Sequence, residues 1–407
     1  MTSKTSEIDP VRSLMTARAV RQHAEKMLAL GEADQLENWT FHPDALPACA
    51  DFVAAVVRRR YPTLSVPFHA RWRHFVFGGR DYWQEIAREA QWRDRDAKAR
   101  ACFDLAITSA LLDAGAGSNW RFQDPGSDLT ASRSEGLALA SLRLFEWGGF
   151  SADPSDPLRA DAEGLARLDE ASLGDAFQSR PGNALEGLGG RARLLNRLGQ
   201  SVDARPELFA LNDAPRPGGL FDVLKARRSA DGTLPAPIIL ETLLDALNPI
   251  WENRPALLGR PLGDCWPHPA VGFVPLHKLS QWLAYSLIEP LQEAGVPVIN
   301  IDGLTGLAEY RNGGLFIDMG VLQLKHGPTD RIYNVADQAI IEWRSLTVAL
   351  LDRIAHLVRT RLDVTDAAFP LACVLEGGTW AAGREIARQK RSDGGPPLLI
   401  HSDGTVF

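Results

Sequence analysis

Apolar positions along much of the chain recur every three or four residues, which is the period of an amphipathic helix. In residues 11–30 this spacing runs from Leu14 to Leu28, and Gly31 follows as a helix stop signal. The same pattern predicts further helices over 44–60, 81–94, 96–114, 133–146, 184–198, 235–247, 276–294, 335–361 and 378–390. The chain is therefore predicted to be mainly α.

Strand signals are few and lie late in the chain. Short apolar runs predict strands within 296–301 and 314–317. Residues 397–407 hold Asp403-Gly404, a two-residue turn signal, between two β-rich runs. We therefore expect a few short strands and a C-terminal β-hairpin beside the helices.

The stretch 151–217 is rich in Asp, Gly, Pro and Ala and carries only short helical pieces. We expect a single unit over 1–407, with any internal boundary in this stretch. The subdivision would be a helical part at 1–150, a linker or insertion at 151–217, and a helical domain at 218–407 that carries the site and the hairpin.

Composition indicates a globular protein and narrows its partners. The chain has 407 residues, 45% of them hydrophobic and 23% charged, enough to bury a sizeable core. Its net charge is -7, and no basic cluster is dense enough to follow a phosphate backbone. We therefore expect no nucleic-acid partner.

Cysteine spacing and the lack of long apolar runs indicate a cytoplasmic location. The four cysteines lie far apart, without CxxC spacing or a disulfide framework. No run of 18 apolar residues occurs, and no apolar stretch follows the N-terminal charges. We expect neither a signal peptide nor a membrane span.

Common cofactor and catalytic motifs are absent from the sequence, including GxxxxGK[ST], HExxH, GxSxG and the EF-hand loop. Gly115-Ala116-Gly117 lacks the third glycine of a dinucleotide fingerprint and ends a predicted helix instead of opening one. The nine histidines show no metal-ligand spacing with carboxylates or cysteines. We expect neither a cofactor nor a resident metal.

The predicted helix 276–294 carries a mixed polar and aromatic face formed by Lys278, Trp282, Tyr285 and Glu289. One interpretation is a lysine that faces a ligand. The alternative is an exposed lysine whose stem covers apolar surface, with the aromatic residues in the core.

The segment VPVINIDGLTGLAEYRNGGLFIDMGVL holds the densest polar set near predicted core elements, namely Asp302, Glu309, Tyr310, Arg311, Asn312 and Asp318. Gly313 and Gly314 would let the backbone approach a ligand closely. A carboxylate here can stabilise developing positive charge, and a guanidinium can hold a phosphate. The alternative is a structural Glu–Arg pair beside a turn.

Two segments combine aromatic and ionisable residues, HARWRHFVFGGRDYW at 69–83 and DCWPHP at 264–269. They supply the candidate ligand contacts His74, Phe75, Trp266 and His268. Trp120 and Trp266 fall in loops between predicted helices, where functional aromatics are more frequent than on helix faces. Core packing remains the alternative for the other tryptophans.

These segments together resemble the uracil-catabolism family of fungi and bacteria, the fourth component of the URC pathway, over almost the whole chain. The likeness also rests on FDLAITSALLDAGAGSNWRF, FVPLHKLSQWLAYSLIEPLQEAG and PPLLIHSDGTVF. A more distant resemblance is to queuosine salvage proteins, which hydrolyse the N-glycosidic bond of a nucleoside 5′-phosphate. It rests on Pro275-Leu276-His277-Lys278 and on LAEYR, where Glu309 replaces the usual Asp and the next residues, Asn312-Gly313-Gly314, differ from the pattern of those proteins.

The resemblances imply a helical, DNA-glycosylase-like fold and hydrolysis of a ribosyl intermediate of uracil breakdown. The expected substrate is a ribosylurea or its 5′-phosphate, cleaved to urea and the ribose moiety. Breaking a ribosidic C–N bond passes through an oxocarbenium-like state, which needs a carboxylate beneath the sugar and a proton donor for the departing nitrogen.

We assign the first carboxylate to Glu309 and the second to Asp264 or Asp318. Phosphate contacts are assigned to Lys278 and Arg311, and leaving-group contacts to His74, Trp266 and His268. Further expected substrate contacts are Tyr310, Asn312, Phe75 and Trp120.

Two other functions stay open on the sequence. One is phosphoribosyl transfer to uracil, although no acidic pair precedes a glycine-rich phosphate loop. The other is a non-catalytic subunit that binds or carries an intermediate of the same pathway. All three imply a small ribosyl or nucleotide-derived ligand, with the oligomeric state left open.

Overall fold

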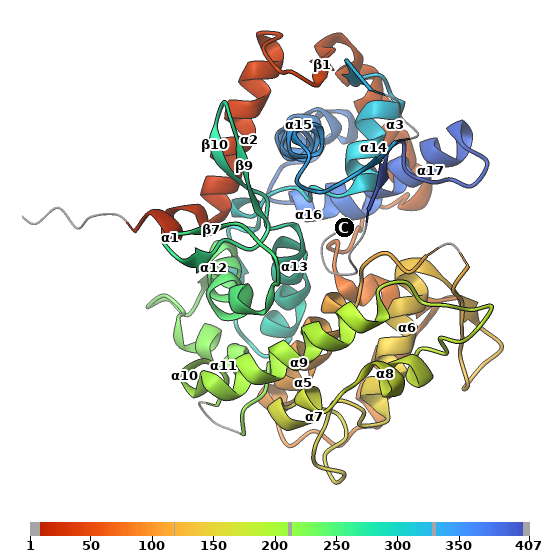
Figure 1. Ribbon diagram of the computed structural model, residues 1–407, viewed down its shortest axis with the longest axis vertical. Coiled ribbons are helices and arrows are strands. Elements are labelled where there is room, and N and C mark those ends of the chain that lie inside the picture. The colour runs from red at the N-terminus through yellow and green to blue at the C-terminus, as the bar shows by residue number, and fades with distance from the viewer. Residues whose placement is uncertain (1–8, 118, 211–213, 328–330, 402–407) are drawn as a thin grey trace, which may run out of the picture.

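The computed structural model describes residues 9–117, 119–210, 214–327 and 331–401, and the fold is built mainly from helices (Figure 1). Its α-helices are α1 Pro10–Leu14, α2 Ala17–Glu32, α3 Leu46–Arg60, α4 Tyr82–Glu89, α5 Arg95–Leu111, α6 Arg133–Glu146, α7 Ala162–Ala166, α8 Glu170–Ala176, α9 Leu188–Ala204, α10 Pro206–Phe209, α11 Gly219–Ala226, α12 Ala236–Leu247, α13 Lys278–Glu293, α14 Tyr310–Asp318, α15 Gln338–Leu362, α16 Leu371–Cys373 and α17 Trp380–Lys390. The 3₁₀ turns are η1 Pro43–Ala45, η2 Arg71–Phe75, η3 Asn248–Ile250 and η4 Ile301–Gly303, and η5 Val374–Thr379 is a π-helical turn.

The strands of the described residues are short and pair only in twos. They are β1 Trp39–Phe41, β2 Val76–Phe77, β3 Arg80–Asp81, β4 Phe122–Gln123, β5 Thr130–Ala131, β6 Leu234–Pro235, β7 Ala256–Leu257, β8 Arg260–Pro261, β9 Cys265–His268, β10 Gly272–Pro275, β11 Val298–Ile299, β12 Leu322–Leu324, β13 Ile332–Tyr333 and β14 Leu399–Ile400. The mainly α class with a few short strands is thus confirmed, whereas the closer likeness to DNA glycosylases stays a prediction.

Most predicted helices are present with shifted ends, and two local predictions change. The first predicted helix is two helices, because the Thr16 hydroxyl accepts a hydrogen bond from Ala19 N and starts α2 anew. The strand predicted at 314–317 is wrong, since these residues belong to α14. An apolar run of four residues cannot by itself distinguish a strand from a buried helix.

The predicted C-terminal hairpin is only partly within the described residues. β14 pairs in parallel with β13, with Leu399 opposite Ile332. The turn at Asp403-Gly404 lies outside the described residues. Residues 151–217 carry α7 to α10, of which α9 packs against α5, and the three-part subdivision of the chain stays a prediction.

The two ends of the chain pack together, as the red and blue helices of Figure 1 show. The long helix α15 packs against α2 and α3, and α14 packs against α17. The α5–α12 part forms the other half of the molecule, and α13 contacts it through α5 and α12. Through its contacts with α5 and α12, α13 is held beside the half of the molecule that also carries α6, while α14 packs against α15 and α17.

The contact between α14 and α17 requires a glycine at position 383. A Cβ on Gly383 would lie 2.1 Å from the backbone oxygen of Arg311. We expect Gly383→Ala to lower the free energy of unfolding by about 1–3 kcal/mol, because the two helices would have to move apart. Denaturant unfolding measures this effect.

The control for this substitution is Gly174→Ala in α8. The added Cβ at Gly174 would meet only the end of the Leu188 side chain, at 3.1 Å. We expect it to change stability by less than about 1 kcal/mol. Equal effects of the two substitutions would show that the α14–α17 contact has no special steric demand.

No helix among the described residues is long and apolar enough to cross a membrane.

Candidate functional site

Helix ends surround a cavity of about 340 Å³ between the two halves of the molecule. Its walls come from the loop after α5, the starts of α6, α13 and α14, the helix α17 and the loop after it. This volume lies in the range of small-molecule sites. The lining residues are His69, His74, Asp113, Ala114, Gly115, Ala116, Gly117, Arg133, Ser134, Glu135, Lys278, Trp282, Leu307, Glu309, Tyr310, Arg311, Trp380, Arg384, Asp393, Gly395 and Pro396.

Three helices begin at this cavity, with Arg133, Lys278 and Tyr310 as their first residues. Helix N-termini carry partial positive charge and unpaired backbone N–H groups, so they favour anions. Carboxylates occupy the starts of α13 and α14, whereas Ser132, the N-cap residue of α6, makes no side-chain cap hydrogen bond. The lining combines four cationic side chains with four carboxylates, namely Arg133, Lys278, Arg311 and Arg384 with Asp113, Glu135, Glu309 and Asp393.

Glu309 is the N-cap residue of α14 and faces the cavity. Its Oε1 accepts a hydrogen bond from Asn312 N at 2.5 Å, and its Oε2 accepts one from Arg311 N at 2.7 Å. The residue is only 8% exposed, so the carboxylate is fixed in position. Each oxygen keeps a second lone pair, which leaves the carboxylate able to face a developing positive charge.

Lys278 lines the same cavity from the start of α13. Burial lowers the pKa of its ammonium group, while the nearby carboxylates of Glu309 and Asp113 oppose this shift. Among the described residues, no side-chain hydrogen bond of Lys278 is found, so its Nζ is available to a ligand.

Arginines supply further positive charge around the cavity. Arg311 Nη1 donates to Gly394 O at 2.8 Å, and its guanidinium lies 4.8 Å from the centre of the Tyr310 ring. Arg384 Nη1 donates to Glu135 Oε1 at 2.5 Å. Burial would raise the pKa of Glu135, but Arg384 lowers it below its ordinary value. Both guanidinium groups are thus held in place by protein acceptors.

Histidine and tryptophan form a further part of the cavity wall. The His74 ring lies edge-on to Trp282, with centroids 5.5 Å apart, and its centroid is 6.0 Å from that of Trp380. Burial, and to a smaller extent the positive charge of Arg71, lowers the pKa of His74 to about 4. His74 is therefore neutral at pH 7. Within the described part of the chain, buried His74 Nδ1 and Trp282 Nε1 lack a hydrogen-bond partner.

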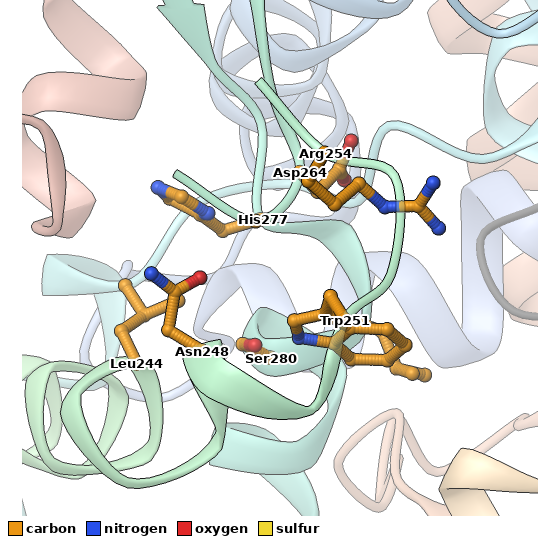
Figure 2. Close-up of a pocket in the computed structure, with 9 residues that line it drawn as sticks. Leu244, Asn248, Trp251, Arg254, Asp264, His277 and Ser280 are labelled. Atoms are coloured by element: carbon orange, nitrogen blue, oxygen red, sulfur yellow. The ribbon is translucent and has the colours of Figure 1, made fainter. Parts of the chain in front are cut away.

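Asp264 lies beside a second and much smaller cavity, which Figure 2 shows with Asn248 and His277 around it. Its volume of about 20 Å³ suffices for about one water molecule. Arg344 Nη1 and Nη2 donate to the two Asp264 carboxylate oxygens, both at 2.8 Å. Burial would raise the pKa of Asp264, but Arg344 and further hydrogen bonds hold it well below its ordinary value.

The Asp264–Arg344 pair connects the starts of α13 and α14. Asp264 Oδ2 accepts a hydrogen bond from Lys278 N at 3.0 Å. Arg344 Nε donates to Ala308 O at 3.2 Å, one residue before Glu309. The pair therefore positions Lys278 and Glu309 and does not itself line the larger cavity.

The structure brings five of the predicted site residues to the large cavity: Glu309, Lys278, Tyr310, Arg311 and His74. The other seven do not line it: Asp264, Asp318, Asn312, Phe75, Trp120, Trp266 and His268. Asp318 pairs with Arg391, at 2.6 and 2.7 Å, and so supports the loop that follows α17.

The predicted aromatic contacts are held in the core by partners of their own. Trp120 Nε1 donates to Phe177 O, and Trp266 Nε1 donates to Asp264 Oδ1. His268 Nε2 lies 3.3 Å from Glu342 Oε1. The side chain of Phe75 is fully buried. Asn312 is also fully buried, behind Glu309. These side chains belong to the packing around the site.

Several cavity residues were missed by the sequence interpretation, among them Asp113, Glu135, Arg384 and His69, whose partner Glu376 does not itself line the cavity. Asp113 lies near the end of the helix predicted over 96–114, and Glu376 precedes Gly377-Gly378 much as Glu309 stands near Gly313-Gly314. These local patterns could have marked Asp113 and Glu376 as candidates. Their partners, Arg71 and His69, are far away in the sequence and could not be found in this way. Among the described residues, no group of three or more His, Cys, Asp or Glu side chains could hold a metal ion.

Comparison with known proteins places this site within a family. Residues 13–407 match the family model described as "Protein of unknown function (DUF1688)". The chain is 38% identical over 411 residues to "Protein urg3" of Schizosaccharomyces pombe, which covers 98% of this chain and 99% of that protein. It is 35% identical over 442 residues to "Uracil catabolism protein 4" of Lachancea kluyveri, again with 98% and 99% covered. The chain therefore belongs to the DUF1688 family.

Proposed function

We propose that the protein acts in uracil catabolism as an N-ribosyl hydrolase that cleaves a ribosylurea, or its 5′-phosphate, to urea and the ribose moiety. The pathway part of this proposal is supported by the printed name of the relative from Lachancea kluyveri. The chemical part rests on one observation: a fixed carboxylate, Glu309, shares a ligand-sized cavity with Lys278 and three arginines.

We assign to Glu309 the role that glycoside cleavage requires of a carboxylate. As the C1′–N bond breaks, positive charge develops on the sugar, and a preorganised negative group stabilises that state without having to reorient. The hydrogen bonds from Arg311 N and Asn312 N hold Glu309 in place during the reaction. Its proposed role is therefore electrostatic stabilisation of the oxocarbenium-like state.

The positive groups suit a 5′-phosphate on the same sugar. Arg311 and Arg384 can donate hydrogen bonds to phosphate oxygens, and Lys278 can add a compact point charge. The start of α6 adds backbone N–H groups, with Glu135 in its first turn. We therefore favour the phosphorylated ureide as the better substrate.

Arg311→Gln tests the phosphate contact. We expect the KM for the ribosylurea 5′-phosphate to rise about 10- to 100-fold, because a charge-assisted hydrogen bond contributes about 1.5–3 kcal/mol. The KM for the unphosphorylated ureide should stay within about twofold. Steady-state urea release from both substrates measures this difference.

The matched control is Arg388→Gln on the exposed side of α17, which should change neither KM. An equal rise of KM for both substrates with Arg311→Gln would exclude a phosphate contact. The proposed reaction itself is tested by urea release from the wild-type protein, and a failure to release urea from either ureide would exclude it.

A further inference from the structure

Besides Glu309 and the arginines, the cavity is lined by His69, which forms a buried pair with the carboxylate of Glu376. His69 Nδ1 lies 2.7 Å from Glu376 Oε2, although 307 positions separate the two residues in the chain. The side chains of His69 and Glu376 are only 5% and 8% exposed. Because Nδ1 faces Glu376, Nε2 is the ring nitrogen left for a ligand in the cavity that His69 lines.

The surroundings of His69 hold its ring in place. Its centroid lies 6.3 Å from that of Trp282 and 5.8 Å from that of Trp380. Its backbone N donates to Ala372 O at 3.0 Å, just before the π-helical turn that carries Glu376. Such turns are rare and occur frequently at functional sites.

The carboxylate partner favours a defined state of this imidazole. Burial would raise the pKa of Glu376, but the hydrogen bond and charge of His69 lower it below its ordinary value. An ionised Glu376 accepts a hydrogen bond from the Nδ1–H group of His69 and so fixes the orientation of the ring. The neighbouring His74 is held neutral and lacks such a carboxylate partner among the described residues.

We propose that His69 is the proton donor for the departing ureide nitrogen and that Glu376 is its positioning residue. This assignment rests on the proposed hydrolase function. As the C1′–N bond breaks, its electron pair goes to nitrogen, which takes the proton from His69 Nε2 and leaves as urea. Water adds its oxygen and one proton to the sugar as the new hydroxyl group, and its other proton restores His69.

Leaving-group dependence separates this role from a structural one. Urea leaves poorly as an anion and needs a proton, whereas the 4-nitrophenolate of 4-nitrophenyl riboside 5′-phosphate leaves without one. We expect His69→Gln to lower kcat for the ureide about 10²–10⁴-fold. We expect its kcat for the nitrophenyl riboside to fall less than about tenfold.

Glu376→Gln keeps the shape of the side chain and removes its charge. It should show the same selectivity for the poor leaving group with a smaller loss, about 10- to 100-fold for the ureide. If near-UV circular dichroism shows that His69→Gln fails to fold, Glu376→Gln tests the assignment in its place. The background control is His356→Gln, on the exposed face of α15, which should match the wild type on both substrates.

Equal losses on both substrates for the folded His69 and Glu376 variants would overturn the assignment while leaving the hydrolase function intact. If wild-type protein cleaves neither substrate, the hydrolase function fails and the assignment fails with it. Full ureide turnover by folded His69→Gln would also overturn the assignment of His69 as the proton donor.

Discussion

Glu309→Gln is expected to lower kcat for ureide hydrolysis about 10²–10³-fold, the effect of removing one preorganised electrostatic group from a buried site. The substitution keeps an oxygen that can accept one of the two α14 backbone hydrogen bonds now made by Glu309. Substrate binding should therefore change little, and the free energy of unfolding should fall by about 1 kcal/mol or less. Urea release under saturating substrate, with denaturant unfolding in parallel, measures both quantities.

A matched control for Glu309→Gln removes the charge of another helix cap. Asp94 caps α5 by accepting a hydrogen bond from Ala97 N, and it is exposed and remote from the cavity lining. Asp94→Asn should cost a similar small amount of stability and leave kcat unchanged. If Glu309→Gln keeps full turnover while folded, Glu309 is a structural cap and the proposed mechanism is wrong.

Asp264→Ala is expected to lower the free energy of unfolding by about 3–5 kcal/mol. Its side chain is 14% exposed and pairs with an Arg344 side chain that is only 1% exposed, so its removal leaves a buried guanidinium without its counter-charge. The cap of α13 is lost as well. Denaturant unfolding measures the change, and Glu385→Ala, which breaks the exposed pair with Arg59, should cost less than about 1 kcal/mol.

The same carboxylate gives the protein an acid-dependent stability. The pKa of Asp264 is lower in the folded chain than in the unfolded chain, so its contribution is complete above the unfolded value of about 3.9 and is lost as pH falls toward the folded value. Asp264→Ala should therefore flatten the acid side of the stability profile below about pH 4. A destabilisation below about 1 kcal/mol would contradict the assigned structural role.

The mainly α class could be predicted because helices such as α2, α3 and α9 bury one face and keep a clear period of three and four residues. The short apolar run at 314–317 failed as a strand signal, since its helical state is set by the cap at Glu309 and by packing against α17. Neither feature is visible in a four-residue window.

Only the site residues that lie in local sequence motifs could be predicted from the sequence. Lys278, Glu309 and Arg311 lie in the two local motifs that predict a distant likeness to queuosine salvage proteins, and the fold brings them to one cavity. The role of Asp264 depends on Arg344, 80 positions away, and that of His69 depends on Glu376. Such long-range pairs are made by helix packing and leave no spacing pattern in the sequence.

The central claim is tested most directly by incubating the purified protein with ribosylurea and with its 5′-phosphate, and by measuring urea and reducing sugar together. The account predicts equal amounts of both products, with the 5′-phosphate as the better substrate. Calorimetric binding of either ureide without any release of urea would contradict the hydrolase function and identify the cavity as a binding site only.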